Sequence, residues 1–431
     1  ERTLPILTLK SKGFLMTLER HYKTKLLWVL FTILIIRMIA MWLVPLTDTT
    51  EARYAEIARK MLETDNWVTP QFDYGVPFWA KPPLSTWASA ISMKIFGVNE
   101  FASRLPSLMC CLGLILLMYF WLNERKNSVA LLAVVILSTS FLFFGSSALV
   151  MTDLFLILAS TIAMLSFWNR VVLDKNRFWG YVFFASLGIG LLAKGPLILV
   201  LVGLPTGTWT LINRQLGRVW TSLPWVIGTV LTIAIAAPWY YLAEQRTPGF
   251  LQYFIIGEHF SRFLISGWKG DMFGHAHSEP FGMIWLYLLL GFTPWIALVA
   301  QIFFKNYSQL KFRDLYRDQW LNYLFLWSVM SVVFFTFAHN IISPYALPAM
   351  PACAILFAEF FVRFNVKDGK FNQKNIFWLS MVIPILAAIA LVILFFKPQS
   401  SPKRSEKDLV AKYYQLRDSE KSKLIYYSQR V

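Results

Sequence analysis

The feature that most constrains this chain is a series of apolar runs of about 20 residues, separated by short polar segments. A helix of that length crosses the hydrocarbon core of a bilayer, which is about 30 Å thick. Only 15% of the residues are charged and 57% are hydrophobic, whereas soluble domains carry about 25% charged residues. We therefore predict an all-α integral membrane protein. A disordered chain, a coiled coil and an ordinary soluble enzyme are excluded.

The apolar runs predict about eleven membrane spans, which form one transmembrane domain over residues 26–396. The break at Ala193-Lys194-Gly195-Pro196 would separate two short spans or form a re-entrant bend. The predicted spans are 26–46, 105–122, 129–149, 154–169, 178–193, 196–212, 223–242, 281–304, 320–338, 344–362 and 376–396.

The net charge of +17 indicates how the chain is oriented in the membrane. In a soluble protein such basicity would suggest nucleic acid, but in membrane proteins Lys and Arg gather in the inside loops. With the N-terminal segment 1–25 inside, every predicted inside segment has more Lys and Arg than Asp and Glu. No nucleic-acid partner is therefore expected. The inside segments are 1–25, 123–128, 170–177, 213–219, 305–318 and 359–375.

The remaining polar residues concentrate in two predicted outer loops, residues 47–104 and 243–280. Four of the five histidines also fall on the outer side, namely His259, His275, His277 and His339. The polar tail 397–431, with a helix expected near 407–417, is too short to bury a core and would begin a small outer domain. Any chemistry is therefore expected at the outer face.

The first outer loop has two amphipathic segments joined by a stiff turn. The first segment has an apolar stripe at helical spacing, made of Tyr54, Ile57, Ala58, Met61 and Leu62, and the second runs from Leu84 to Ile95. Both predict helices lying at the membrane interface. Lys81 stands before two prolines, so its backbone is extended. A lysine on such a turn suits an anionic headgroup, or it could simply reach toward lipid phosphate.

Several other polar residues each have a functional and a structural interpretation. Asp48 and Glu51 are spaced as a capping box, or one or both of them face a cavity as a base or metal ligand. Asp153 could act in the site or cap its helix with Thr152. His259 could bind a metal or lie on the surface, since Glu258 beside it is a weak metal signal without a third ligand.

Six motifs resemble those of lipid-carrier-dependent glycosyltransferases, the aminoarabinose transferases of lipid A and the protein O-mannosyltransferases, which have the GT-C fold. Their order is kept along about residues 26–430. The motifs are Glu-Ala-Arg-Tyr-Ala-Glu-Ile-Ala-Arg from Glu51, Lys-Pro-Pro-Leu from Lys81, Met-Thr-Asp ending at Asp153, Lys-Gly-Pro from Lys194, Glu-His-Phe-Ser-Arg from Glu258 to Arg262, and Tyr-Ala-Leu-Pro from Tyr345.

This resemblance implies a function. The donor would be a monosaccharide on a polyprenyl (undecaprenyl) phosphate carrier, and the acceptor would be lipid A or an exported protein, at the periplasmic face of a bacterial inner membrane. Cations would stabilise the leaving phosphate, and a carboxylate would act as base in an inverting transfer. The implied catalytic residues are Asp48, Glu51 and Asp153. The implied phosphate and lipid-carrier ligands are Arg53, Tyr54, Lys81, Lys194, Arg262 and Tyr345.

Two positions depart from the family pattern. The aminoarabinose transferases have Asp directly before the Glu of the first motif, where this chain has Thr50, and the nearest Asp is Asp48. The family often has Glu before Lys-Pro, where this chain has Ala80. The base therefore stays open between Asp48 and Glu51. A divalent metal ion held with His259 is a further expectation.

Two other classes of function compete with an enzyme. A secondary transporter or lipid flippase would show internal repeats and ionisable residues near the membrane midplane. No repeat is evident, and the polar candidates lie at span ends apart from Arg37, which we expect to pair within the bundle or face a cavity. A non-catalytic scaffold is supported only by Thr50 and Ala80. The pattern favours a glycosyltransferase.

Overall fold

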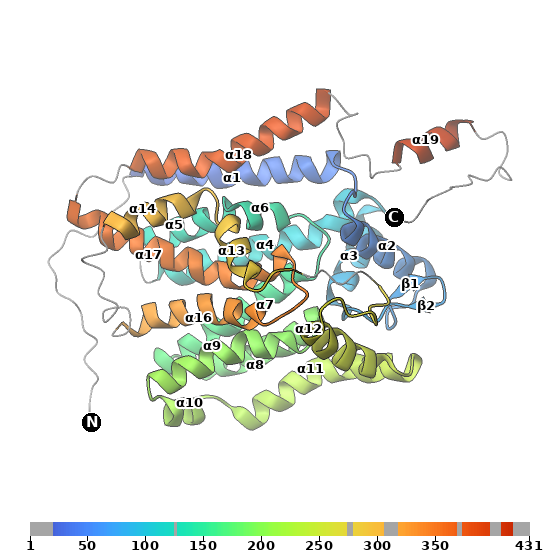
Figure 1. The fold of residues 1–431 in the computed structure, drawn as a ribbon, viewed down its shortest axis with the longest axis horizontal. Helices are drawn as coiled ribbons and strands as arrows, with labels where there is room; N and C mark the ends of the chain where they lie inside the picture. Colours follow the sequence, from blue (N-terminus) through green and yellow to red (C-terminus); the bar gives the residue numbers. More distant parts are fainter. Residues whose placement is uncertain are drawn as a thin grey trace.

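The protein is an elongated bundle of helices in which the long helices run roughly side by side (Figure 1). The computed structural model describes residues 20–124, 127–273, 279–305, 318–368, 373–396 and 407–416. Within this part the only strands are β1 (Gln71–Asp73) and β2 (Val76–Pro77), which form a small antiparallel hairpin. The predicted all-α class is thus confirmed.

Seven helical segments of the described chain are long and apolar enough to cross a membrane. A bent pair, α13 (Met283–Gly291) with α14 (Trp295–Lys305), would make eight. Three apolar helices are shorter: α5 (Asn127–Ser138), α8 (Phe178–Lys194) and α9 (Leu197–Ile212). The seven are α1 (Arg20–Leu43), α4 (Glu100–Asn123), α7 (Asp153–Phe167) continued by η1 (Trp168–Val172), α11 (Trp225–Arg246), α16 (Gln319–Thr336), η3 (Ser343–Ala349) continued by α17 (Met350–Asp368), and α18 (Gln373–Phe396).

Each predicted span coincides with one of these helices or with a pair of them, while the count of eleven itself is not confirmed. Two spans are broken. Predicted span 129–149 ends as α5 at Ser138 and resumes as α6 (Phe141–Ser146). Predicted span 281–304 bends by 100° between α13 and α14, where Pro294 has no N–H to continue a helix. Hydropathy alone does not reveal such breaks, because both halves are equally apolar.

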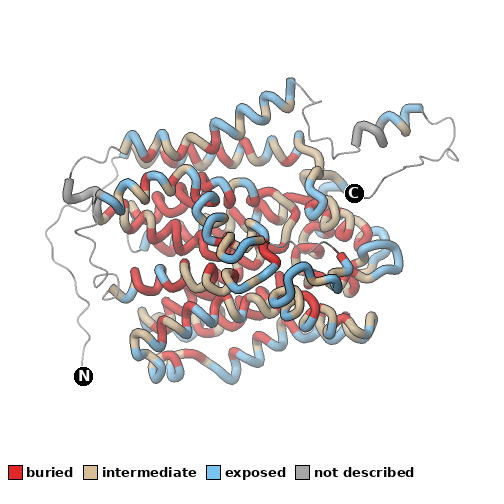
Figure 2. Tube along the Cα trace, viewed as in Figure 1, coloured by how far each residue is buried: buried red, intermediate tan, exposed pale blue. Residues whose placement is uncertain are grey.

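Burial separates central helices from peripheral ones (Figure 2). In the segment Ser343–Arg363, 83% of the membrane window is buried, and in Asp153–Val172 the share is 72%. In α1 and α18 it is only 22% and 17%, and these two helices lie together along one edge of the bundle (Figure 1). The outer helices therefore present apolar side chains to lipid, as helices at the edge of a membrane bundle should.

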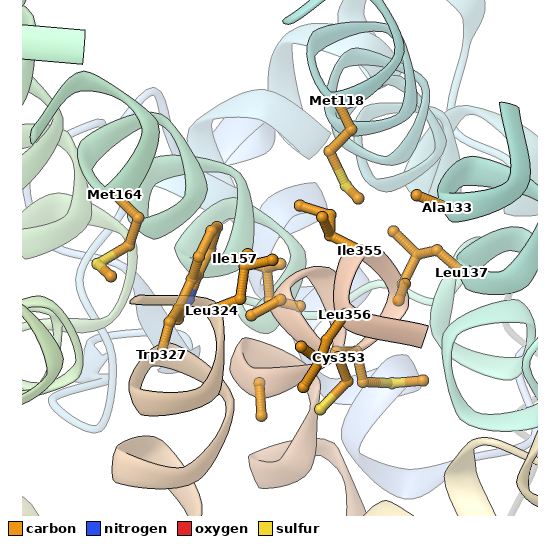
Figure 3. Packing of buried hydrophobic residues seen from close by; sticks show 14 of the residues in the cluster. Met118, Ala133, Leu137, Ile157, Met164, Leu324, Trp327, Cys353, Ile355 and Leu356 are labelled. Carbon is orange, nitrogen blue, oxygen red and sulfur yellow. The ribbon is translucent and has the colours of Figure 1, made fainter. Parts of the chain in front are cut away.

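The core between the central helices is packed with aliphatic, Met and Trp side chains (Figure 3). Met118 of α4, Leu137 of α5, Ile157 of α7 and Ile355 of α17 are each fully buried. Lipid tails are as apolar as these side chains, so close packing rather than the hydrophobic effect holds such helices together.

The elements of the two outer loops gather at one end of the bundle, on the right in Figure 1. The first loop forms α2 (Thr49–Thr64), the hairpin and α3 (Leu84–Phe96), which confirms the two amphipathic helices. Close to them lie η2 (Gln252–Ser261) and α12 (Arg262–Leu264). The other short helices are α10 (Leu216–Ser222) and α19 (Lys407–Leu416), and α19 matches the helix expected in the tail.

We predict that close packing of α8 on α11 depends on Gly228. A Cβ at this position would overlap the ring of Phe184. Gly228→Ala should therefore lower stability by about 1–3 kcal/mol, seen as a lower Tm of the purified protein. Gly203 of α9 is the matched control, because it is exposed and a Cβ there would meet open space. An unchanged Tm for Gly228→Ala would contradict this packing.

Candidate active site

Lys81 meets a buried carboxylate from the second outer loop. Its Nζ lies 3.0 Å from Oε2 of Glu258 and also donates to the carbonyl oxygen of Ala80 at 2.7 Å. Arg262 Nη1 donates to the same Glu258 oxygen at 3.1 Å, and the Tyr253 hydroxyl lies 3.1 Å from Oε1. The side chain of Glu258 is only 3% exposed. Glu258 therefore holds two predicted phosphate ligands side by side.

The charge state of Glu258 is determined by its two cationic partners. Burial by itself would raise the pKa of this carboxyl, but the positive charges of Lys81 and Arg262 outweigh that effect. The pKa consequently lies below its ordinary value. Glu258 is thus an anion at neutral pH, and the ion pairs persist under physiological conditions.

A second ion pair joins α7 to α8. Lys194 Nζ lies 2.5 Å from Oδ1 of Asp153, and both side chains are less than 10% exposed. The same Nζ is 4.8 Å from the centre of the Tyr345 ring. The side chain of Thr152, the N-cap residue of α7, makes no capping hydrogen bond. The alternative prediction, in which Asp153 and Thr152 cap this helix, is therefore wrong. Asp153 instead faces Lys194.

Tyr54 and Tyr345 connect the two ion-pair groups. Burial raises the pKa of the Tyr54 hydroxyl, and the negative charges of Asp153 and Glu258 raise it further. Lys194 in turn lies close enough to Lys81 and Arg262 to be repelled by their charges. We call this set the outer cluster, and it consists of Tyr54, Lys81, Asp153, Lys194, Glu258, Arg262 and Tyr345.

Arg53 lies at the edge of the outer cluster, next to Tyr54 in α2. It is half-buried, and its guanidinium lies 5.9 Å from the centre of the Phe72 ring in the hairpin. Among the described residues it makes no hydrogen bond or ion pair. Arg53 therefore differs from Lys81, Lys194 and Arg262, each of which already has a carboxylate partner.

The other two predicted carboxylates lie outside the outer cluster. Asp48 is exposed and caps α2, because its side chain accepts from the N–H groups of Thr50 at 2.9 Å and Glu51 at 3.1 Å. Its part of the predicted capping box is confirmed. The carboxylate of Glu51 does not bond back to the start of its own helix.

Glu51 forms a buried ion pair with Arg104 of α4. Nε and Nη2 of Arg104 each donate to a different carboxylate oxygen at 2.8 Å, and the backbone N–H of Val150 donates to the same carboxylate at 3.2 Å. Arg104 also donates to the carbonyl oxygens of Val44 and Pro45 just after α1. The pair thus ties α1, α2 and α4 to the segment that leads into Asp153.

Arg104 and Glu258 are functional candidates to which the sequence analysis assigned no catalytic or phosphate-binding role. Arg104 is the single basic residue of α4, a mostly apolar helix, which is the signal that could have identified it. The signal for Glu258 was its position four residues before Arg262, a spacing at which helical side chains pair.

The described residues do not form a metal site around His259. Its Nδ1 lies 2.8 Å from the carbonyl oxygen of Phe254, and its Nε2 lies 3.3 Å from that of Lys194. Burial lowers the pKa of the imidazole. No group of three or more His, Cys, Asp or Glu side chains suited to a metal occurs in the described chain. His275 and His277 lie outside the described residues, and the metal stays a prediction.

Comparison with known proteins identifies the family. Residues 23–254, more than half of the chain, match the sequence profile of dolichyl-phosphate-mannose-protein mannosyltransferases. The chain belongs to this family. It is also similar to proteins named undecaprenyl phosphate-alpha-4-amino-4-deoxy-L-arabinose arabinosyl transferase. The one from Erwinia tasmaniensis is 29% identical over 375 residues, covering 85% of this chain and 64% of the relative.

Further similarities agree with this assignment. The transferase of the same name from Photorhabdus laumondii is 30% identical over 359 residues, covering 80% of this chain and 60% of the relative. The crystal structure of ArnT from Cupriavidus metallidurans bound to undecaprenyl phosphate has a TM-score of 0.70 at 22% identity. The match covers 86% of this chain and 65% of that one, and it shows the same fold. The chain spans about three fifths of the length of the curated relatives it matches.

We predict that Glu51 serves the structure rather than the reaction. Glu51→Gln removes the negative charge that balances Arg104. Removing one partner of a buried ion pair lowers the free energy of unfolding by about 3–5 kcal/mol. The Tm of the purified variant should therefore drop strongly. Glu63→Gln is the control, because this side chain is 52% exposed. A Glu51→Gln protein that keeps its Tm but loses activity would instead point to a catalytic role.

Acid stability should report on Glu258. The pKa of Glu258 is lower in the folded protein than in the unfolded chain. Its ion pairs therefore add to the free energy of unfolding above the ordinary carboxyl pKa, and this contribution is lost as the pH falls through the folded-state pKa. Lys81→Met removes one cation and raises that pKa, so the acid midpoint of unfolding should move to higher pH. Melting curves from pH 3 to pH 6 would measure it. Lys94→Met on the exposed face of α3 should leave the midpoint unchanged.

Proposed function

We propose that this protein transfers a monosaccharide from an undecaprenyl phosphate carrier to an acceptor at the periplasmic face of a bacterial inner membrane. The observation that carries the proposal is the outer cluster, which gathers three cations and two carboxylates where the first outer loop meets η2 and α12. Relatives of similar sequence are named for an undecaprenyl phosphate-linked aminosugar. A pentose such as 4-amino-4-deoxy-L-arabinose is accordingly the proposed sugar.

The cations suit the leaving group of this reaction. When the bond between sugar and phosphate breaks, negative charge grows on the phosphate, and fixed positive groups stabilise it without reorganising. Lys81 and Arg262 are held in place by Glu258, and Arg53 has no carboxylate partner among the described residues. These three residues are proposed to bind the phosphate, with Tyr54, Lys194 and Tyr345 completing the walls.

The proposed base is Asp153. In a direct inverting displacement the acceptor oxygen attacks the anomeric carbon, the phosphate leaves with the bonding electrons, and the acceptor proton passes to a carboxylate. Lys194 binds Oδ1 of Asp153, and no hydrogen bond to Oδ2 occurs among the described residues. Asp48 would have to release its helix cap before acting as base, and Glu51 would have to leave Arg104.

The acceptor is proposed to be lipid A or lipopolysaccharide. The resemblance to the aminoarabinose transferases of lipid A favours it, and the relatives are named for that sugar. The family description would instead suggest the hydroxyl group of an exported protein. A transporter or flippase is the less favoured alternative. Its ionisable residues would lie near the membrane midplane, whereas the paired residues here lie in α2, η2 and the ends of α7 and α8.

Transfer from a radiolabelled polyprenyl-phosphate sugar pool in membranes tests the proposal. Lys81→Ala and Asp153→Asn should each reduce the label in the lipid A fraction by about 100-fold or more, because each removes a group acting on the transition state. Lys94→Ala should transfer at the rate of the unsubstituted protein. Label that appears in protein instead would identify a protein acceptor. Full transfer by both site variants would refute the assignment of the outer cluster.

A further inference from the structure

Arg37 lies in the middle of the outer half of α1 and has no acidic partner among the described residues. Its Nε and Nη2 atoms are buried and make no hydrogen bond. The residue is six positions before Leu43, the end of α1, which places it about 9 Å along the helix from that end. An ionised group at such a depth costs free energy unless an anion or a polar group pairs with it.

The nearest charged groups are already occupied. Glu51 and Arg104 lie close enough to interact electrostatically with Arg37. However, both oxygens of Glu51 accept from Arg104, and one also accepts from Val150. Arg104 uses its remaining N–H groups on carbonyl oxygens after α1. This group of three therefore holds two positive charges and one negative charge, and it lacks one anion.

Arg37 packs against α6, and part of α6 is exposed at the surface of the bundle. Its guanidinium stacks on the ring of Phe144 in α6, 4.0 Å from the ring centre. The next residue, Gly145, is exposed, and a Cβ there would meet no atom within 4 Å. Phe141, one turn earlier in α6, is 60% exposed. At the outer end of α1, exposed Trp42 stacks on Phe101, as aromatic residues do at the membrane interface.

We propose that Arg37 binds the phosphate group of a membrane phospholipid in the outer leaflet, between α1 and α6. A guanidinium face packed on an aromatic ring leaves its N–H edge to donate, and two N–H groups on one edge match two phosphate oxygens. The headgroup enters past Gly145, and the acyl chains lie on the exposed side of α6. This site is separate from the outer cluster and takes no part in the proposed transfer.

Thermal shifts of the delipidated protein in neutral detergent test the site. Adding phosphatidylglycerol should raise the Tm of the unsubstituted protein, whereas inorganic phosphate at the same concentration should raise it less. Arg37→Met removes an unpaired buried charge, so without lipid this variant should melt at a higher temperature than the unsubstituted protein. Its response to phosphatidylglycerol should need a concentration about tenfold higher or more.

A second variant leaves the charge in place and blocks the way in. Gly145→Leu should also abolish the shift caused by phosphatidylglycerol, while the control Gly203→Leu, at another exposed helical glycine with open space around it, should keep the shift. The proposal is overturned if Arg37→Met melts lower than the unsubstituted protein without lipid, or if both site variants respond to phosphatidylglycerol normally. A larger shift from inorganic phosphate than from the lipid would assign the site to a free anion instead.

Discussion

Charged side chains in or beside an apolar bundle must find partners, because little water is available there to solvate an isolated ion. Three ion pairs at the outer end of this bundle follow that constraint. Glu51 with Arg104 fixes the entry into α2, Asp153 with Lys194 joins α7 to α8, and Glu258 joins the first outer loop to the second through Lys81. The same pairs that hold the end of the bundle together also concentrate its charge.

The fold was largely predictable, because runs of apolar residues and short local patterns determine where helices form. The helices of the first loop followed from the spacing of their apolar residues, and Lys81 lies outside any helix, as the two prolines after it predict. The breaks after Ser138 and before Trp295 were not predicted, since each interrupts a run that stays apolar on both sides. Length and hydropathy do not distinguish one straight span from two shorter helices.

The site was predictable only in part. Lys81, Asp153, Lys194, Arg262 and the two tyrosines were identified from the residues and the resemblance, and the structure brings them together. Their pairing was not predictable, because Lys81 and Glu258 are 177 residues apart, and Glu51 and Arg104 are 53 apart. Periodicity describes neighbours along one helix. It carries no information about which distant carboxylate a given cation will meet.

The two prolines after Lys81 also affect how the site would behave between rounds of the proposed transfer. Each pyrrolidine ring restricts one backbone torsion, so the chain that carries the ammonium group has little freedom to lose when an anion arrives. When the spent carrier departs, that chain has equally little freedom to regain. The lysine would therefore meet each new lipid in nearly the same place, without a slow rearrangement of the loop before the next round.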